Sequence, residues 1–117
     1  MNNNTYWSPP LPLTPEAIDI NIEPSCIGNY RLAKSLSPDG YLHVSYVGRS
    51  DSDIATRIAD HLGEGYRYFR FCYQPSRRAA YEQECRDYHE FGGDKGLLDN
   101  EIHPDSPAFM NYKCPYC

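Results

Sequence analysis

Runs of hydrophobic and aromatic residues with high β propensity, separated by polar turn residues, predict the strands of this protein. From Ile27 to Leu32 the residues favour a strand, and the turn sequence Ser-Pro-Asp-Gly at 37–40 separates it from the β-favouring run Tyr41 to Val47. We expect these two runs to form an antiparallel hairpin. A third run, Tyr66 to Tyr73, has strong β propensity and a roughly alternating pattern, so it predicts a third strand.

Two later stretches of the chain predict helices. Hydrophobic residues recur at helical spacing after the hydroxyl and carboxylate groups of residues 49–52, which predicts a helix from about Asp53 to Leu62, ended by glycines. Pro75-Ser76 then precedes a run of good helix formers from Arg77 to about Phe91, which Gly92-Gly93 closes. The predicted order is therefore β-β-α-β-α.

This order predicts an α+β fold in which helices flank a small three-stranded antiparallel sheet. Residues 1–25 are rich in proline, and proline removes backbone donors and restricts the preceding residue. We therefore expect an extended N-terminal arm over 1–25, with a short turn of helix from Pro15 as an alternative. The folded domain is expected over 26–117, including a mostly irregular C-terminal tail.

Length and composition indicate one modest domain with many tyrosines. The chain has 117 residues, which suits a single core, and its 11 Tyr outnumber its 4 Phe and single Trp. The first residues do not combine a basic region with an apolar stretch, and no run approaches the length of a membrane span. We expect a soluble, cytoplasmic protein that does not enter a membrane.

The charge of the chain is acidic in total but uneven along its length. A net charge of −5 argues against a protein that holds nucleic acid by bulk electrostatics. Acidic residues crowd into 82–105, whereas six arginines lie in the middle of the chain: Arg49, Arg57, Arg67, Arg70, Arg77 and Arg78. A basic face on an acidic protein is compatible with this distribution.

Two tripeptides on the predicted hairpin carry a family resemblance together with three later residues. Gly28-Asn29-Tyr30 and Tyr46-Val47-Gly48 are followed in order by Arg57, His61 and Glu84. In this set the chain resembles the GIY-YIG nuclease superfamily, which includes homing endonucleases and some restriction enzymes. Asn29 departs from the usual aliphatic residue, and the gap between the tripeptides is long for the family. Because strand neighbours point to opposite faces, Asn29 need not disturb Tyr30.

The same residues suit the hydrolysis of a phosphodiester, which needs an activated water and stabilisation of negative charge. We expect catalytic roles for Tyr30, Tyr46 and His61 in activating water and moving protons, and for Arg57 in binding phosphate. Glu84, rather than the reserve Glu82, is expected to hold Mg²⁺ or Mn²⁺, because helix geometry sets it among apolar residues.

Two further residues are expected to contact the substrate. Arg49 belongs to the basic middle of the chain and directly follows the second tripeptide. Asn100 matches, by the resemblance, an asparagine that closes the active site in the larger family.

The cysteines and histidines predict a second, structural metal site. Cys85 and His89 are four positions apart on one helix face, and the tail ends in Cys114-Pro115-Tyr116-Cys117, a spacing typical of zinc sites. These four ligands would bind Zn²⁺ and pin the tail, with His103 as a substitute ligand. A redox C-x-x-C pair and a frayed terminus are the alternatives. We expect Cys26 and Cys72 to be buried small hydrophobic residues.

A longer set of residues also resembles a subgroup of bacterial and phage proteins within the same superfamily. The set comprises Glu84-Cys85, Tyr88-His89, Phe91-Gly92, Leu98-Asp99-Asn100, Ile102-His103-Pro104 and the terminal Cys114-Pro115-Tyr116-Cys117. That resemblance extends over residues 27 to 117. The functional hypothesis is a metal-dependent endonuclease that cuts nucleic acid, with DNA as the expected partner. A non-catalytic module that binds nucleic acid or protein, and a structural subunit of a larger assembly, are the alternatives that keep the same fold.

Overall fold

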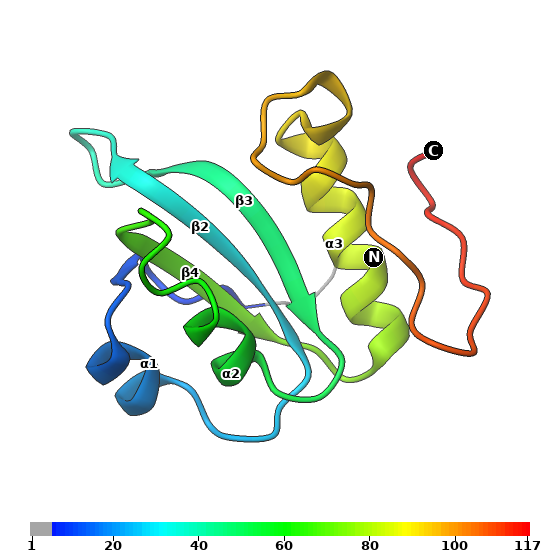
Figure 1. The fold of residues 1–117 in the computed structure, drawn as a ribbon, viewed down its shortest axis with the longest axis horizontal. Helices are drawn as coiled ribbons and strands as arrows, with labels where there is room; N and C mark the ends of the chain where they lie inside the picture. Colours follow the sequence, from blue (N-terminus) through cyan, green and yellow to red (C-terminus); the bar gives the residue numbers. More distant parts are fainter. Residues whose placement is uncertain (1–5) are drawn as a thin grey trace.

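A computed structural model describes residues 6–117 of the chain as an α+β fold (Figure 1). Four strands form one antiparallel sheet in the order β1-β4-β2-β3. The strands are β1 (Leu11–Pro12), β2 (Gly28–Leu36), β3 (Leu42–Ser50) and β4 (Tyr68–Tyr73). The helices are α1 (Pro15–Asn21), α2 (Ile54–Ala59), α3 (Arg77–Glu90) and the short 3₁₀ helix η1 (Gly93–Lys95). The predicted α+β class and antiparallel sheet are confirmed, but the prediction of three strands is one short.

The N-terminal segment is more ordered than the predicted extended arm. The Thr14 hydroxyl caps α1 by accepting a hydrogen bond from the Ala17 amide at 3.1 Å, and Pro15 occupies the first turn. Ile18 and Ile22 of this segment are buried in the main core. The alternative of a helix from Pro15 is therefore the correct one, while residues 1–5 of the predicted arm lie outside the described residues.

The fourth strand, β1, lies at the sheet edge next to β4. Its two residues include Pro12, and a residue without an amide hydrogen fits a sheet only where it need not donate to a ladder, as at an edge. The same proline is why the sequence pattern indicated an irregular arm.

The helix predicted from about Asp53 to Leu62, which is α2, ends earlier than expected. Beyond Ala59 the amides of His61 and Leu62 bond to carbonyls three residues back, at 3.0 and 3.1 Å, and Gly63 adopts φ of +87°. The last turn is thus tighter than an α-helix. This turn sets His61 just outside α2, next to the sheet.

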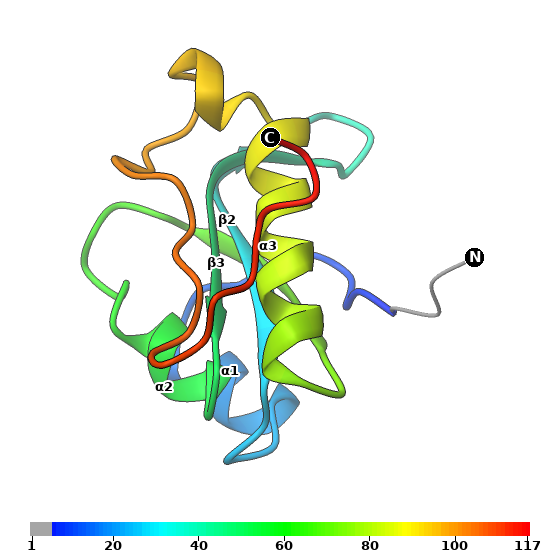
Figure 2. The ribbon, with the colours of Figure 1, turned by 90° about the vertical axis from the view of Figure 1, so that its right-hand side faces the viewer.

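The two faces of the sheet have different partners, as Figure 2 shows with the sheet nearly edge-on between α3 and the α1–α2 pair. Tyr30 and Leu32 belong to the main core, which also contains residues of α1 and α2. Val47 points to the other face, where it packs with Tyr88 and Leu98. Alternation along β2 and β3 therefore assigns each side chain to one of two helical layers.

Polar side chains of β2 attach α3 to the sheet. The Asn29 side-chain amide donates to the Ala80 carbonyl at 2.9 Å, so Asn29 points away from the face of Tyr30, as expected. Arg31 donates to both carboxylate oxygens of Asp87, at 3.1 and 2.8 Å, and Asp87 is 1% exposed. The sequence pattern gave no sign of this buried ion pair, which fixes the position of α3 along the strand.

The two tripeptides meet across the hairpin. Tyr30 of β2 pairs with Gly48 of β3, and a Cβ atom at residue 48 would overlap the Tyr30 ring and hydroxyl. At Gly28 a Cβ atom would overlap the Cys72 carbonyl of β4. Both glycines are therefore required by close approach, and Gly48 leaves the space that the Tyr30 phenol occupies. Within residues 6–117 no helix is long and apolar enough to cross a membrane.

We predict that Gly48→Ala destabilises the protein by about 1–3 kcal/mol, because the new methyl group forces Tyr30 out of its place. Urea unfolding measures the change, and His43→Ala, an exposed substitution on the same strand, should leave stability nearly unchanged. An alanine protein as stable as the original would contradict the close packing of Tyr30 on residue 48.

Candidate active site and metal cluster

A polar cavity of about 280 Å³ opens beside β3, and it is called the arginine cavity below. The residues that line it come from β3, the turn after it, α2, α3 and the segment after η1: Tyr46, Arg49, Ser50, Asp51, Ser52, Arg57, Glu84, Asn100, Ile102, His103, Pro104 and Asp105. Because β3 is an edge strand, side chains from both faces of the sheet reach this cavity around its edge. Tyr46, Arg57 and Glu84, which the sequence predicted to act together, all line it.

Glu84 is held in the arginine cavity by an ion pair with Arg49. An Nη1 hydrogen of Arg49 is donated to Glu84 Oε1, and Arg49 Nε donates to Asp51 at 2.9 Å. The Arg49 and Glu84 side chains are each only 12% exposed. Burial raises the pKa of the Glu84 carboxyl above its usual value, although the neighbouring Arg49 charge opposes the shift.

The reserve acid Glu82 lies elsewhere on α3. It pairs with Arg78 at 3.2 Å, one turn earlier on the exposed side of the helix. Glu82 is absent from the lining of the arginine cavity, whereas Glu84 is part of it. The helix-face argument that preferred Glu84 therefore agrees with the position of both side chains.

Tyr30, Tyr46 and His61 form one contiguous group next to the arginine cavity. The Tyr30 hydroxyl lies 2.9 Å from His61 Nε2, and the ring centroids of Tyr46 and His61 are 4.7 Å apart. Tyr30 is 2% exposed, and burial raises its pKa far above the usual range of a phenol. Tyr46 is half-buried, and burial followed by the Glu84 charge raises its pKa as well.

Tyr46 also lines a second cavity of about 420 Å³, called the tyrosine cavity. Its lining is Tyr46, His61, Glu64, Tyr66, Asp99, Glu101 and Ile102. Tyr46 and Ile102 thus line both cavities. Of the two motif tyrosines, Tyr30 and Tyr46, only Tyr46 lines either of these cavities. Tyr30 lies behind it, in contact with His61.

Asn100 is occupied by the backbone of β3 rather than free for a substrate. Its side-chain oxygen accepts from the Val47 amide at 3.0 Å, and its nitrogen donates to the Val47 carbonyl at 2.8 Å. The Asp99 amide donates to the Ser45 carbonyl at 2.7 Å. The segment 99–100 therefore caps the outer edge of β3 in the manner of a further strand, and it holds the wall formed by 102–105 against the arginine cavity.

The C-terminal tail brings four metal-binding side chains together. One ligand atom from each of His89, His103, Cys114 and Cys117 lies within 4.8 Å of all the others. His103 Nδ1 donates to the Pro104 carbonyl at 2.8 Å, and His89 Nδ1 lies 3.7 Å from Asp94 Oδ2. Both rings present Nε2 toward Cys117, and for His103 the carbonyl acceptor at Nδ1 orients the ring, as is common for metal-binding histidines.

The predicted ligand Cys85 lies outside this group, and the predicted substitute His103 is inside it. Cys85 is fully buried under the tail, and its thiol is hydrogen-bonded to Cys114. Burial and this bond raise the pKa of Cys85 to about 12. Burial alone would raise the pKa of Cys114, but the Tyr116 amide and the neighbouring thiols lower it to about 6.

The remaining cysteines agree in part with expectation. All five cysteines are free thiols. Cys72 is buried, whereas Cys26 is only partly buried and faces the Pro24 carbonyl.

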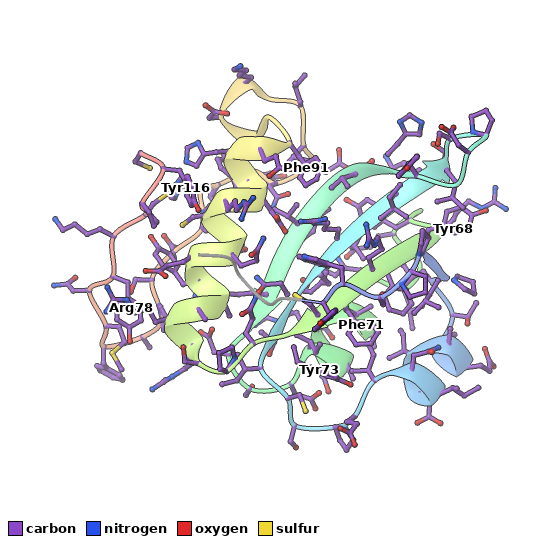
Figure 3. The ribbon with its side chains drawn as sticks, turned by 180° about the vertical axis from the view of Figure 1, so that it is seen from behind. Tyr68, Phe71, Tyr73, Arg78, Phe91 and Tyr116 are labelled. Atoms are coloured by element: carbon purple, nitrogen blue, oxygen red, sulfur yellow. The ribbon has the colours of Figure 1, made fainter. Side chains whose placement is uncertain are left out.

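Aromatic and cationic side chains hold the tail along α3. Figure 3 labels Arg78 and Tyr116 on this side of the helix, one toward each end of the contact. The Arg78 guanidinium lies 5.4 Å from the Tyr112 ring centroid, and the ring centroids of Tyr116 and His89 are 6.4 Å apart. The expected docking of the tail beside the second long helix is therefore present in the fold.

The sequence did not single out Asp51 or Glu64 as site residues. Asp51 and Glu84 both accept hydrogen bonds from Arg49. Glu64 accepts a hydrogen bond from His61 Nδ1 at 2.8 Å. The only local signals were Asp51 two positions after Arg49 and Glu64 three after His61. Such spacings are too common to select a residue.

In comparisons with known proteins, no protein-family model, curated protein or solved structure matches this chain significantly. The resemblance of its motifs to the GIY-YIG superfamily therefore stays a prediction from the residues themselves.

We predict that Asn100→Ala destabilises the protein by about 1–3 kcal/mol, because two backbone groups of the buried Val47 lose their partners. Hydrogen exchange at the Val47 amide should accelerate markedly in this variant. Glu101→Ala, at the exposed neighbouring position, serves as the control. Unchanged exchange at Val47 would mean that Asn100 does not cap the strand.

Proposed function

We propose that this protein is a metal-dependent endonuclease of the GIY-YIG type that hydrolyses nucleic-acid phosphodiesters, with DNA as the expected substrate. The observation that supports it is the arginine cavity, in which Tyr46, Arg57 and Glu84 share one surface. These three residues come from three different elements, and they were selected from the sequence by motif order and, for Glu84, by helix geometry. Their convergence is what a common site requires.

Each side chain has a role that its surroundings suit. Arg57 is exposed at the cavity wall, where a guanidinium can bind a phosphate through paired donors. Tyr46 can orient the attacking water, since it is the motif tyrosine that lines the cavity. Tyr30 and His61 lie directly behind it and can take a proton from that water. Arg49 balances the charge of Glu84 when no substrate phosphate is present.

Glu84 fits the role of ligand to Mg²⁺ or Mn²⁺. Glu84 shares the lining of the polar cavity with the carboxylates of Asp51 and Asp105, and such a cavity suits Mg²⁺, which keeps several waters and binds through one or two carboxylates. When bound, such an ion supplies Lewis acidity toward a phosphoryl oxygen. Because burial raises the Glu84 pKa, protonation removes this ligand at a higher pH than it would for an exposed glutamate.

A second candidate is a module that binds nucleic acid or protein without cutting. The Arg49–Glu84 ion pair favours this candidate, because Glu84 already has a cationic partner in the fold. The net charge of −5 favours it too. The two candidates differ in whether Glu84 is needed for turnover or only for the shape of the cavity.

We predict that the protein cuts plasmid or single-stranded DNA with Mg²⁺ or Mn²⁺, and that Glu84→Gln and Arg57→Ala each slow cleavage by about 100-fold or more. Glu82→Gln is the matched control on the same helix, and it should cut as the original does. Thermal melting verifies that each variant is folded.

Two outcomes would count against the endonuclease. Glu84→Gln and Arg57→Ala proteins that cut at the original rate would exclude the proposed site. A folded original protein that cuts no DNA or RNA with either metal, yet binds nucleic acid, would favour the second candidate.

We also propose that the cluster of His89, His103, Cys114 and Cys117 binds one structural Zn²⁺. Two thiolates and two imidazoles are a complete tetrahedral set for zinc, with no position left for a substrate. The hydrogen bond from His103 Nδ1 to the Pro104 carbonyl, which leaves Nε2 free for a metal, supports this assignment. Because metal binding contributes folding energy, the ion would hold the tail and with it the cavity wall at 102–105.

We predict about one zinc per chain by elemental analysis of protein prepared without chelator. Cys117→Ser and His103→Gln should each lower the zinc content and make the tail more sensitive to protease. Cys85→Ser should keep its zinc, because Cys85 lies outside the ligand group. Loss of zinc in Cys85→Ser with retention in His103→Gln would restore the ligand set expected from the sequence.

A further inference from the structure

A chain of two hydrogen bonds links Tyr30 to a carboxylate through His61. The Tyr30 hydroxyl lies 2.9 Å from His61 Nε2, and His61 Nδ1 lies 2.8 Å from Glu64 Oε1. The imidazole side chain is 12% exposed, while that of Glu64 is 52% exposed. The histidine is thus bonded at both ring nitrogens, to a buried phenol at one side and to a carboxylate at the other.

The chemistry of the two partners determines where the proton of a neutral imidazole lies. An ionised carboxylate only accepts hydrogen bonds, so His61 Nδ1 must carry the hydrogen that faces Glu64. The neutral ring then has a bare lone pair at Nε2, which can only accept, so the Tyr30 hydroxyl donates to it. Glu64 in this way selects the tautomer that draws the proton of Tyr30.

The other groups packed around His61 do not compete for this role. Tyr46 and Tyr66 contact the ring through their faces or edges, at centroid distances of 4.7 and 6.1 Å. The Tyr66 hydroxyl is directed to Asp99, to which it donates at 2.8 Å. Glu64 is therefore the charged group to which His61 is hydrogen-bonded.

We infer that Glu64 is a positioning residue that holds His61 ready to receive the Tyr30 proton. The catalytic part of this inference rests on the proposed nuclease function. A water gives one proton to the Tyr30 oxygen as the Tyr30 hydroxyl proton passes to His61 Nε2. The resulting hydroxide forms the new bond to phosphorus, the bond from phosphorus to the leaving oxygen breaks, and the leaving oxygen takes up a proton from solvent. Glu64 stabilises the imidazolium, which later returns its proton to solvent.

The burial of Tyr30 is consistent with a coupled transfer. Burial disfavours a free phenolate at this position, so the phenol gains nothing by ionising first. A proton that arrives while another leaves keeps the buried oxygen neutral. The charge instead appears on the His61–Glu64 pair, at the margin of the tyrosine cavity.

The first test does not depend on cleavage. Long-range ¹H–¹⁵N correlation spectra of protein labelled at histidine report the tautomer of each ring, and His61→Gln assigns the His61 signals. We expect the hydrogen at Nδ1 in the original protein, and we expect Glu64→Ala to move it to Nε2. Glu64→Gln should keep it at Nδ1, because the amide oxygen still accepts. Glu101 lines the tyrosine cavity together with His61 and Glu64, so Glu101→Gln is the control and should leave the tautomer unchanged. A hydrogen at Nε2 in the original protein, or an unchanged tautomer in Glu64→Ala, would overturn the inference.

The second test measures the catalytic consequence. We expect Glu64→Ala to lower kcat about tenfold or more with little change in KM, and Glu64→Gln to recover part of the loss. Cleavage by Glu64→Ala at the original kcat would overturn the catalytic role. If the original protein cuts nothing, the proposed function fails, but the spectra still decide whether Glu64 sets the state of His61.

Discussion

The pairing of Tyr30 with Gly48 is the contact on which the rest of the site depends. It fixes the register of β2 against β3, and a slip of one residue would move every side chain of one strand to the opposite face. In the observed register Tyr30 and Tyr46 share the face of α2. Arg49 points to the face of α3, where it meets Glu84. One glycine without a side chain thus makes room for a buried phenol and orders both layers.

The two layers would stay separate if β3 were in the middle of the sheet. A central strand would divide the tyrosines from Glu84, since they come from opposite faces. Because β3 is an edge strand, the arginine cavity extends around it and receives side chains from both layers. The segment after η1 then closes the outer side with Asn100 and the residues near His103. The cavity therefore combines parts from both sides of the sheet without any chain crossing it.

Much of this fold could be predicted from the sequence, because its strands and long helix have clear periodicity. The β2–β3 hairpin and α3 follow from alternation, turn residues and the Ser76 cap, whose hydroxyl accepts from the Ala79 amide. The position of β1 could not be predicted, because its proline removes the local strand signal and only pairing with β4 orders it. Helix rotation correctly separated Glu84 from Glu82, because a regular helix of this length obeys its period.

Specific contacts between side chains could not be predicted from the sequence. Motif order brought out Tyr46, Arg57 and Glu84, but the ion pair of Arg49 with Glu84 and the bond of His61 to Glu64 depend on side-chain directions in the folded chain. The choice of His103 over Cys85 depends on the path of an irregular tail, which has no period to extrapolate. Cys85 has ideal spacing from His89 on the helix, yet it faces the buried side beneath Cys114.

The capping of β3 by residues 99–100 also affects how the molecule behaves toward copies of itself. An uncovered strand edge presents backbone donors and acceptors that can pair with another chain, which is a common start of aggregation. The side chain of Asn100 occupies the Val47 donor and acceptor, and the Asp99 amide occupies the Ser45 carbonyl. The same few hydrogen bonds that build a wall of the cavity therefore leave fewer free backbone groups on this strand edge for pairing with another chain, so the geometry of the site and the protection of the edge are linked.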